Sequence, residues 1–212
     1  MNQERVIYTI GHSTHPIADF HALILKYKID TLIDVRSTPA SSYSPQFNKD
    51  SLEASLSRIH IRYMHFGVEF GARQTDESLL DAKGIVDFEL VQKTYNFQSG
   101  LERIDIGESK GYRIALMCAE ADPLECHRFS MVSPPIEEIG IHVIHILKDG
   151  DSVTHTELEK QLLKKYEKKL PVPSLFEPDI TEKDKLRFAY KLHNKDIGWR
   201  LENFDNHFIQ YD

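Results

Sequence analysis

The chain has 212 residues, of which 41% are hydrophobic and 28% are charged, a composition typical of globular proteins and unlike that of disordered or transmembrane chains. Its 26 lysines and arginines against 33 aspartates and glutamates give a net charge of -7, which disfavours non-specific coating of nucleic acid or anionic membrane. The chain has two cysteines, Cys118 and Cys126, which excludes a disulfide scaffold and favours a reducing compartment.

The N-terminal residues do not have the pattern of a targeting signal. A charged pair, Glu4 and Arg5, interrupts the first apolar stretch, which is too short for a signal peptide. The sequence also lacks the apolar run of about 18 residues that a membrane-spanning helix needs. We therefore expect a cytoplasmic protein without a membrane partner.

Strand and helix patterns alternate along the first 170 residues. Strands are predicted, in chain order, over residues 5–10, 30–35, 61–66, 112–117 and 141–147. Helices are predicted over about 16–27, 51–59, 84–107, 123–132 and 154–169. This alternation predicts a layered α/β domain over residues 1–170, with a mainly parallel sheet flanked by helices.

Prolines predict two further boundaries. The pair Pro134-Pro135 is expected to end the helix that begins at Pro123. A linker is predicted from Pro171, Pro173 and Pro178, followed by a C-terminal helical tail that completes residues 171–212. Because this tail contains Trp199, Phe204 and Phe208, we expect it to pack on the domain or on a partner.

Polar residues collect where three of the predicted strands end. The first strand ends in Gly11-His12-Ser13, the second in Asp34-Val35-Arg36, and the fourth in Cys118-Ala119-Glu120; the segment Cys126-His127-Arg128 follows nearby. Ligands bind beyond the carboxyl ends of strands in parallel α/β sheets. We therefore expect these groups to converge at one edge, where the Arg36 guanidinium would suit a carboxylate or phosphate.

Structural alternatives remain open for the charged residues and the serine. Asp34 and Arg36 are two apart on a strand and face the same side, so they could form a structural ion pair. Ser13 could serve only to cap the following helix, and Gly11 could serve only to permit a tight turn.

Three interpretations remain open for the two cysteines. They could be small buried hydrophobic residues, or reactive thiols activated near a helix N-terminus. They could also bind zinc together with His127 and His12. The seven residues between Cys118 and Cys126 do not match zinc-knuckle or ribbon spacing, so no metal ligand is predicted and the cofactor stays unknown.

A resemblance to a known family joins these motifs. Five segments resemble, in the same order, the bacterial and archaeal family called domain of unknown function 488: TIGHS (9–13), LIDVRSTPASSYSPQFNKDSL (32–52), YMHFGVEFGAR (63–73), LMCAEADPLECHR (116–128) and IHVIHILKDG (141–150). The pattern CAE-x-x-P-x-x-CHR is the most specific of them. The resemblance implies an α/β domain of unknown activity with these motif positions: His12, Ser13, Asp34, Arg36, Pro39, Phe47, Gly71, Arg73, Cys118, Glu120, Cys126, His127 and Arg128.

The sequence departs from the family pattern in two places. Phe70-Gly71-Ala72 stands where the family usually has a Leu-Gly-Gly step. Ser133-Pro134-Pro135 stands where the family usually continues a helix, and is expected to shorten it. Residues beyond 170 have no assigned counterpart in the family.

The favoured functional hypothesis is a pocket for an anionic small molecule, a nucleotide or single-stranded nucleic acid. Its catalytic candidates are His12, Glu120, Cys126 and His127, of which Glu120 or His12 would act as general acid or base. Its ligand-binding candidates are Ser13, Asp34, Arg36, Phe47, Arg73, Cys118 and Arg128. In this hypothesis the arginines hold phosphate, and Phe47 and Tyr43 stack on a base.

Two alternatives from other classes are kept. One is a thiol- or metal-dependent enzyme that uses Cys118, Cys126 and His127. The other is a non-catalytic interaction module whose motifs are structural. The sequence leaves open whether catalysis occurs and which oligomeric state the protein adopts.

Overall fold

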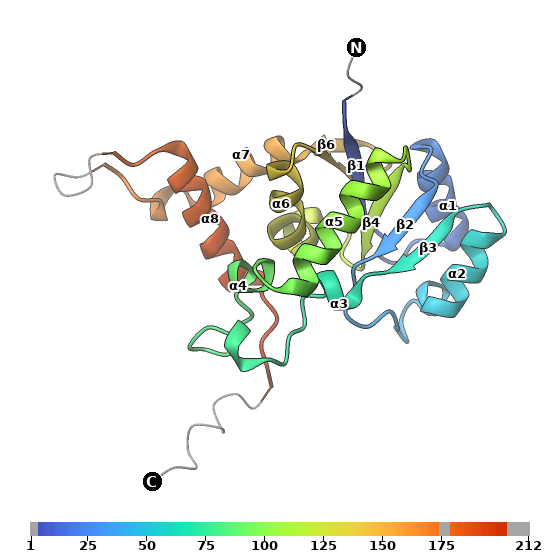
Figure 1. The fold of residues 1–212 in the computed structure, drawn as a ribbon, viewed down its shortest axis with the longest axis horizontal. Coiled ribbons are helices and arrows are strands. Elements are labelled where there is room, and N and C mark those ends of the chain that lie inside the picture. The colour runs from blue at the N-terminus through green and yellow to red at the C-terminus, as the bar shows by residue number, and fades with distance from the viewer. Residues whose placement is uncertain (1–3, 174–178, 203–212) are drawn as a thin grey trace, which may run out of the picture.

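The computed structural model describes residues 4–173 and 179–202. The described residues contain a six-stranded sheet with helices on both faces (Figure 1). Its strand order is β3-β2-β4-β1-β5-β6; all neighbouring strands run parallel except β6, which is antiparallel to β5. The strands are β1 (Val6–Gly11), β2 (Thr31–Asp34), β3 (Arg62–His65), β4 (Ile114–Cys118), β5 (His142–Ile146) and β6 (Ser152–Thr154). The predicted α/β layered fold is confirmed.

The helices divide between the two faces of the sheet. They are α1 (Ile17–Lys26), α2 (Lys49–Ser57), α3 (Gly67–Phe70), α4 (Phe88–Gln92), α5 (Tyr95–Ser109), α6 (Ser133–Glu138), α7 (His155–Tyr166) and α8 (Glu182–Ile197). On β2, Leu32 packs with α1 and α2, whereas Ile33 packs with α5 and α6. Successive side chains of a strand point to opposite faces, so a strand with apolar residues on both sides holds the two layers together.

The strand order places a topological switch point beyond the end of β4. The connections after β1 and β2 lead to α1 and α2 on one face, whereas the connection after β4 leads to α6 on the other. Because β4 lies between β1 and β2, the chain leaves neighbouring strands in opposite directions at this point. Such topological switch points are where open α/β sheets bind ligands.

Gly11 permits close packing at this switch point. It lies beside Cys118 in the register of β1 and β4. A Cβ atom on Gly11 would lie 1.8 Å from the carbonyl oxygen of Glu120. Glycine is therefore required here because of a close backbone approach, and the ends of β1 and β4 are in direct contact.

The prediction that Pro134-Pro135 ends a helix was wrong. Residues 123–132 form a short 3-10 turn, Pro123–Glu125, and a π-helical turn, Arg128–Val132; α6 then starts at Ser133 and includes both prolines. The first turn of a helix needs no intrahelical N–H donors, so it accepts proline. The Ser133 hydroxyl also donates to the carbonyl oxygen of Arg128 at 2.6 Å.

Other boundaries also differ from the sequence prediction. The helical pattern over 84–107 is divided between α4 and α5, because Thr94 caps α5 by accepting from the backbone N–H of Phe97. The three-residue strand β6 was not predicted.

The C-terminal helix packs on the rest of the chain. Helix α8 begins with a capping box at Thr181 and packs against α7, and Trp199 and Leu201 pack against the core cluster that includes residues of α4 and α5. Phe204, Phe208 and Pro178 lie outside the described residues, and the domain boundary at residue 170 stays a prediction. Within the described part of the chain, no helix has the length and apolarity needed to cross a bilayer.

Candidate functional site

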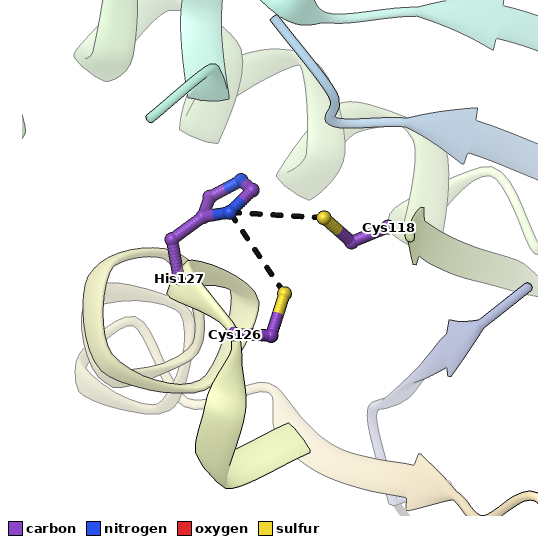
Figure 2. Close-up of side chains that lie close together, drawn as sticks. All are labelled: Cys118, Cys126 and His127. Atoms are coloured by element: carbon purple, nitrogen blue, oxygen red, sulfur yellow. Dashed lines mark hydrogen bonds between the residues drawn. The ribbon is translucent and has the colours of Figure 1, made fainter. Parts of the chain in front are cut away.

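Two cysteines and a histidine meet beyond the end of β4. Cys118 is the last residue of β4, whereas Cys126 and His127 follow the 3-10 turn Pro123–Glu125. Figure 2 shows the His127 ring facing both sulfurs, with Nδ1 lying 3.7 Å from Sγ of Cys118 and 3.8 Å from Sγ of Cys126. The three side-chain donor atoms all lie within 4.8 Å of one another. Both cysteines are buried and free.

Backbone groups hold this cluster in place. The Nε2 atom of His127 lies 3.3 Å from the carbonyl oxygen of Val35, and a carbonyl can only accept, so Nε2 carries the proton. The other ring nitrogen, Nδ1, faces the two sulfurs. The backbone N–H of Arg128 donates to Sγ of Cys126 at 3.5 Å. A histidine that donates its second ring N–H to a carbonyl, and a sulfur that accepts a backbone N–H, are typical second-shell features of metal sites.

Glu120 is the acidic group next to the sulfurs. The Cys118 thiol donates to its Oε2 at 2.9 Å. Glu120 is exposed as a residue, but partial desolvation of its carboxyl beside the buried sulfurs raises its pKa, and the neighbouring Cys126 sulfur acts in the same direction. Desolvation acts to raise the pKa of Cys126, but the Cys118 thiol, Arg128 and His127 outweigh it and lower that pKa below its usual range. Cys126 is thus the more acidic of the two thiols, since the pKa of Cys118 is raised by Cys126 and by burial.

Arg128 closes the loop that carries this cluster. Its side chain is fully buried, and its Nη1 and Nη2 atoms donate to the carbonyl oxygens of Glu120 at 2.7 Å and Ala121 at 3.0 Å. The Nε atom of Arg128 has no hydrogen-bond partner among the described residues. The structure thus gives Arg128 a role in positioning the loop, while its predicted contact with a ligand stays a prediction.

A second buried cluster lies on the α1 and α2 side of the same edge. Arg36 donates from Nε to Oδ1 of Asp34 at 2.9 Å and from Nη2 to Oδ2 at 2.6 Å. It also donates to the carbonyl oxygen of Phe47 at 2.8 Å, and the hydroxyl of Tyr63 donates to Asp34 Oδ2 at 2.8 Å. This geometry is that of a structural ion pair, in which the N–H groups of the Arg36 guanidinium donate to acceptors of the protein itself.

His12 belongs to this second cluster. Its Nε2 atom accepts from Nη1 of Arg36 at 2.9 Å, and Nδ1 then donates to the carbonyl oxygen of Ser13 at 2.8 Å. The ring stacks on Phe47 with centroids 4.3 Å apart. Burial lowers the pKa of His12 to about 4, which keeps the ring neutral near pH 7. His12 and Phe47 are thus engaged with each other, and His12 is not a member of the three-residue group with the cysteines.

The side chains of the remaining predicted residues are not part of either cluster. The backbone N–H of Ser13 donates to the carbonyl oxygen of Ala119 at 2.8 Å, which joins the ends of β1 and β4. Arg73 is exposed, and its backbone N–H donates to the Ser37 hydroxyl at 2.9 Å. Tyr43, which was expected to stack on a base, is 94% exposed.

Comparison with known proteins assigns the family. The family model described as "Domain of unknown function DUF488" matches residues 16–132, which is more than half of the 212 residues. The chain belongs to this family. The DUF488 match includes the Asp34-Val35-Arg36 segment and the whole Cys118–Arg128 motif, whereas Gly11-His12-Ser13 and the residues after 132 lie outside it. The searches of curated proteins and of solved structures find no match to this chain.

Two partners that organise the candidate site were not predicted from the sequence. The Val35 carbonyl orients His127, and the Tyr63 hydroxyl completes the shell around Asp34. Tyr63 carries a usable signal, because it lies on a predicted strand inside a segment that resembles the family. The Val35 carbonyl has no such signal in the sequence, because every residue type has a backbone carbonyl.

Proposed function

We propose that this chain is a metal-dependent hydrolytic enzyme whose metal ligands are Cys118, Cys126 and His127, with Zn²⁺ as the best-fitting ion. The distances between the donor atoms carry the proposal. Tetrahedral zinc with Zn–S and Zn–N bonds of about 2.3 and 2.0–2.1 Å separates a sulfur from a nitrogen ligand by about 3.6 Å. Here the Nδ1–Sγ separations are 3.7 and 3.8 Å.

The donor set supports zinc in a catalytic rather than a structural role. Thiolate and imidazole ligands suit Zn²⁺ and disfavour Mg²⁺ or Ca²⁺. Three protein ligands are typical of catalytic zinc sites, whereas structural sites usually have four. A bound zinc ion would supply Lewis-acid activation of a water or a substrate oxygen.

The position of the cluster supports an enzyme. It lies at the topological switch point beyond β4, where a substrate can approach. The cysteines are buried, whereas His127 is half-buried and Glu120 is exposed, so solvent reaches the cluster from the side of these two residues. Glu120 is the carboxylate nearest the sulfurs and is the candidate group for proton transfer to or from a substrate.

The anion-pocket hypothesis has weaker support. The guanidinium groups of Arg36 and Arg128 donate to protein acceptors, which leaves Arg73 as the exposed arginine of the predicted three. The free cysteines fit a reducing compartment such as the cytoplasm.

Metal analysis of the purified full-length chain tests the proposal. After loading with Zn²⁺ and dialysis, we expect elemental analysis to find about one zinc per chain. Cys126→Ser and His127→Asn are each expected to lose zinc affinity by at least about tenfold, since each removes a ligand. The matched control is His60→Asn, because His60 is exposed and has a φ of 61°, which asparagine tolerates. Zinc retention by Cys126→Ser equal to that of the control would contradict the proposal.

A chromogenic ester tests the hydrolytic part separately. The zinc-loaded chain should hydrolyse 4-nitrophenyl acetate faster than the chelator-treated chain, and Glu120→Gln should lower this rate while retaining the zinc. If zinc binds but the rates are equal, the metal site stands and the hydrolytic assignment is wrong.

A further inference from the structure

A cavity of about 660 Å³ lies away from the cysteine cluster. It is lined by residues of α4, α6, α7 and α8, which come together at one end of the molecule (Figure 1). Its volume falls in the range of small-molecule sites, about 300–1,000 Å³. Apolar side chains form much of its wall, among them Phe88, Pro134 and Leu186. We refer to this cavity as the α8 groove.

A buried hydroxyl without a partner lines the α8 groove. Ser130 is 4% exposed, and its Oγ has no hydrogen-bond partner among the residues that the structure describes. Buried polar atoms in proteins are nearly always hydrogen-bonded. The Ser130 hydroxyl can therefore bond to a polar group from outside the chain.

A chain of hydrogen bonds sets the position of Glu159 in the groove wall. The Tyr190 hydroxyl donates to Oε1 of Glu159 at 3.0 Å and accepts from Nε2 of His155 at 2.9 Å. The Nδ1 atom of His155 then accepts from Nε2 of His145 at 3.1 Å, and Nδ1 of His145 accepts from the Thr9 hydroxyl at 2.8 Å. Every bond runs in the same direction, so both rings are neutral and Glu159 receives no countercharge from them.

The wall formed by α6 and α7 carries uncompensated negative charge. Glu137, Glu138 and Glu159 line it, and within residues 4–173 and 179–202 no lysine or arginine forms an ion pair with any of them. Glu137 Oε1 accepts from the backbone N–H of Val143, and its Oε2 lies 3.4 Å from Nδ1 of His142. Burial, together with the charge of Glu137, raises the pKa of Glu159, as expected for a carboxylate that lacks a cation.

The basic residues of the opposite wall are partly neutralised. Arg187 and Lys191 of α8 both pair with Glu89, at 2.9 and 3.5 Å. Lys183 and Lys195 also line the groove, twelve positions apart along α8. A helix rises 1.5 Å per residue, so these two lysines are about 18 Å apart along α8.

We propose that the α8 groove is a binding site for a small organic cation, an ammonium, amidinium or guanidinium group on an apolar body. The cationic group would contact Glu159 and Glu138 and the Ser130 hydroxyl, and the apolar body would lie against Phe88 and Leu186. This site is independent of the proposed metal centre.

Benzamidine tests the proposal, with benzamide as its neutral isostere. Titration of the full-length chain, followed by protein NMR or calorimetry, should give saturable binding of benzamidine at about 1 mM or below and no saturable binding of benzamide. Glu159→Gln and Glu138→Lys should each weaken benzamidine binding at least about fivefold. Glu138 is exposed, so its replacement keeps the test valid if Glu159→Gln destabilises the fold. The matched control is Glu167→Gln, an exposed glutamate outside the groove.

Three outcomes would overturn the proposal. They are the absence of saturable benzamidine binding, equal binding of benzamide, and equal benzamidine affinity in Glu138→Lys and the Glu167→Gln control.

Discussion

Replacing Asp34 with alanine is expected to lower the free energy of unfolding by about 3–5 kcal/mol, the usual cost of removing one partner of a buried ion pair. Asp34 is fully buried and Arg36 is 7% exposed. The substitution leaves a guanidinium in the protein interior without its counterion, and it also removes the acceptor of the Tyr63 hydroxyl. Urea denaturation of the full-length chain measures the effect.

A double variant separates the loss of the ion pair from the loss of packing. In Asp34→Ala/Arg36→Met no unpaired charge remains, so we expect it to recover part of the stability lost in Asp34→Ala. A single variant within about 1 kcal/mol of the original chain, as for an exposed ion pair, would contradict the structural role assigned to this pair.

Several histidines are buried in the neutral form, and each is expected to contribute a loss of stability as the pH drops below 6.5. Burial lowers the pKa of His155 to about 3 and that of His12 to about 4, and the pKa of His145 is also lowered by burial. The unfolded chain protonates these rings near pH 6.5. Below that pH the unfolded state binds more protons than the folded state, so each ring costs about 1.4 kcal/mol per pH unit until its folded pKa is reached.

Comparing the original chain with the His155→Gln variant separates the contribution of His155 to the pH dependence of stability from that of the other titrating groups. Raised pKa values at Glu120, Glu159 and His127 act in the opposite direction, so the total slope is not the useful quantity. Between pH 6 and 4.5, His155→Gln should lose stability less steeply than the original chain, by about 1.4 kcal/mol per pH unit. Urea denaturation at several pH values gives both slopes. Parallel slopes would mean that His155 is not held neutral.

Much of the fold could be predicted from local patterns. Three of the strands are short apolar runs that end in Gly11, Asp34 or Cys118, and the alternation of strands with helices is sufficient to predict a parallel sheet. The convergence of these strand ends follows from that topology. The error at Pro134-Pro135 has a simple cause. Proline is common both just after a helix and in the first turn of one, and a single sequence does not distinguish the two cases. Here the prolines lie in the first turn of α6, which follows a π-helical turn directly.

The chemistry of the site was harder to predict. The sequence predicts no metal ligand, because zinc spacing rules describe ligands on compact loops, whereas of the ligands we propose Cys118 ends a strand and Cys126 follows a separate turn. The sequence also suggested His12 as a further ligand, but its ring is bonded to Arg36. The arginines at the strand ends correctly indicated positive charge there. They did not indicate guanidinium groups available to a ligand, because Arg36 and Arg128 donate to backbone carbonyls of the protein itself.

Zinc K-edge X-ray absorption of the loaded full-length chain tests the central claim most directly, because it reports the ligand atoms themselves. We predict a four-coordinate spectrum fitted by two sulfurs at about 2.3 Å and lighter atoms, including one imidazole nitrogen, at about 2.0–2.1 Å. In Cys126→Ser the sulfur shell should fall to one atom or the zinc should be lost. A first shell made only of nitrogen and oxygen, with no sulfur, would contradict a metal centre at Cys118, Cys126 and His127.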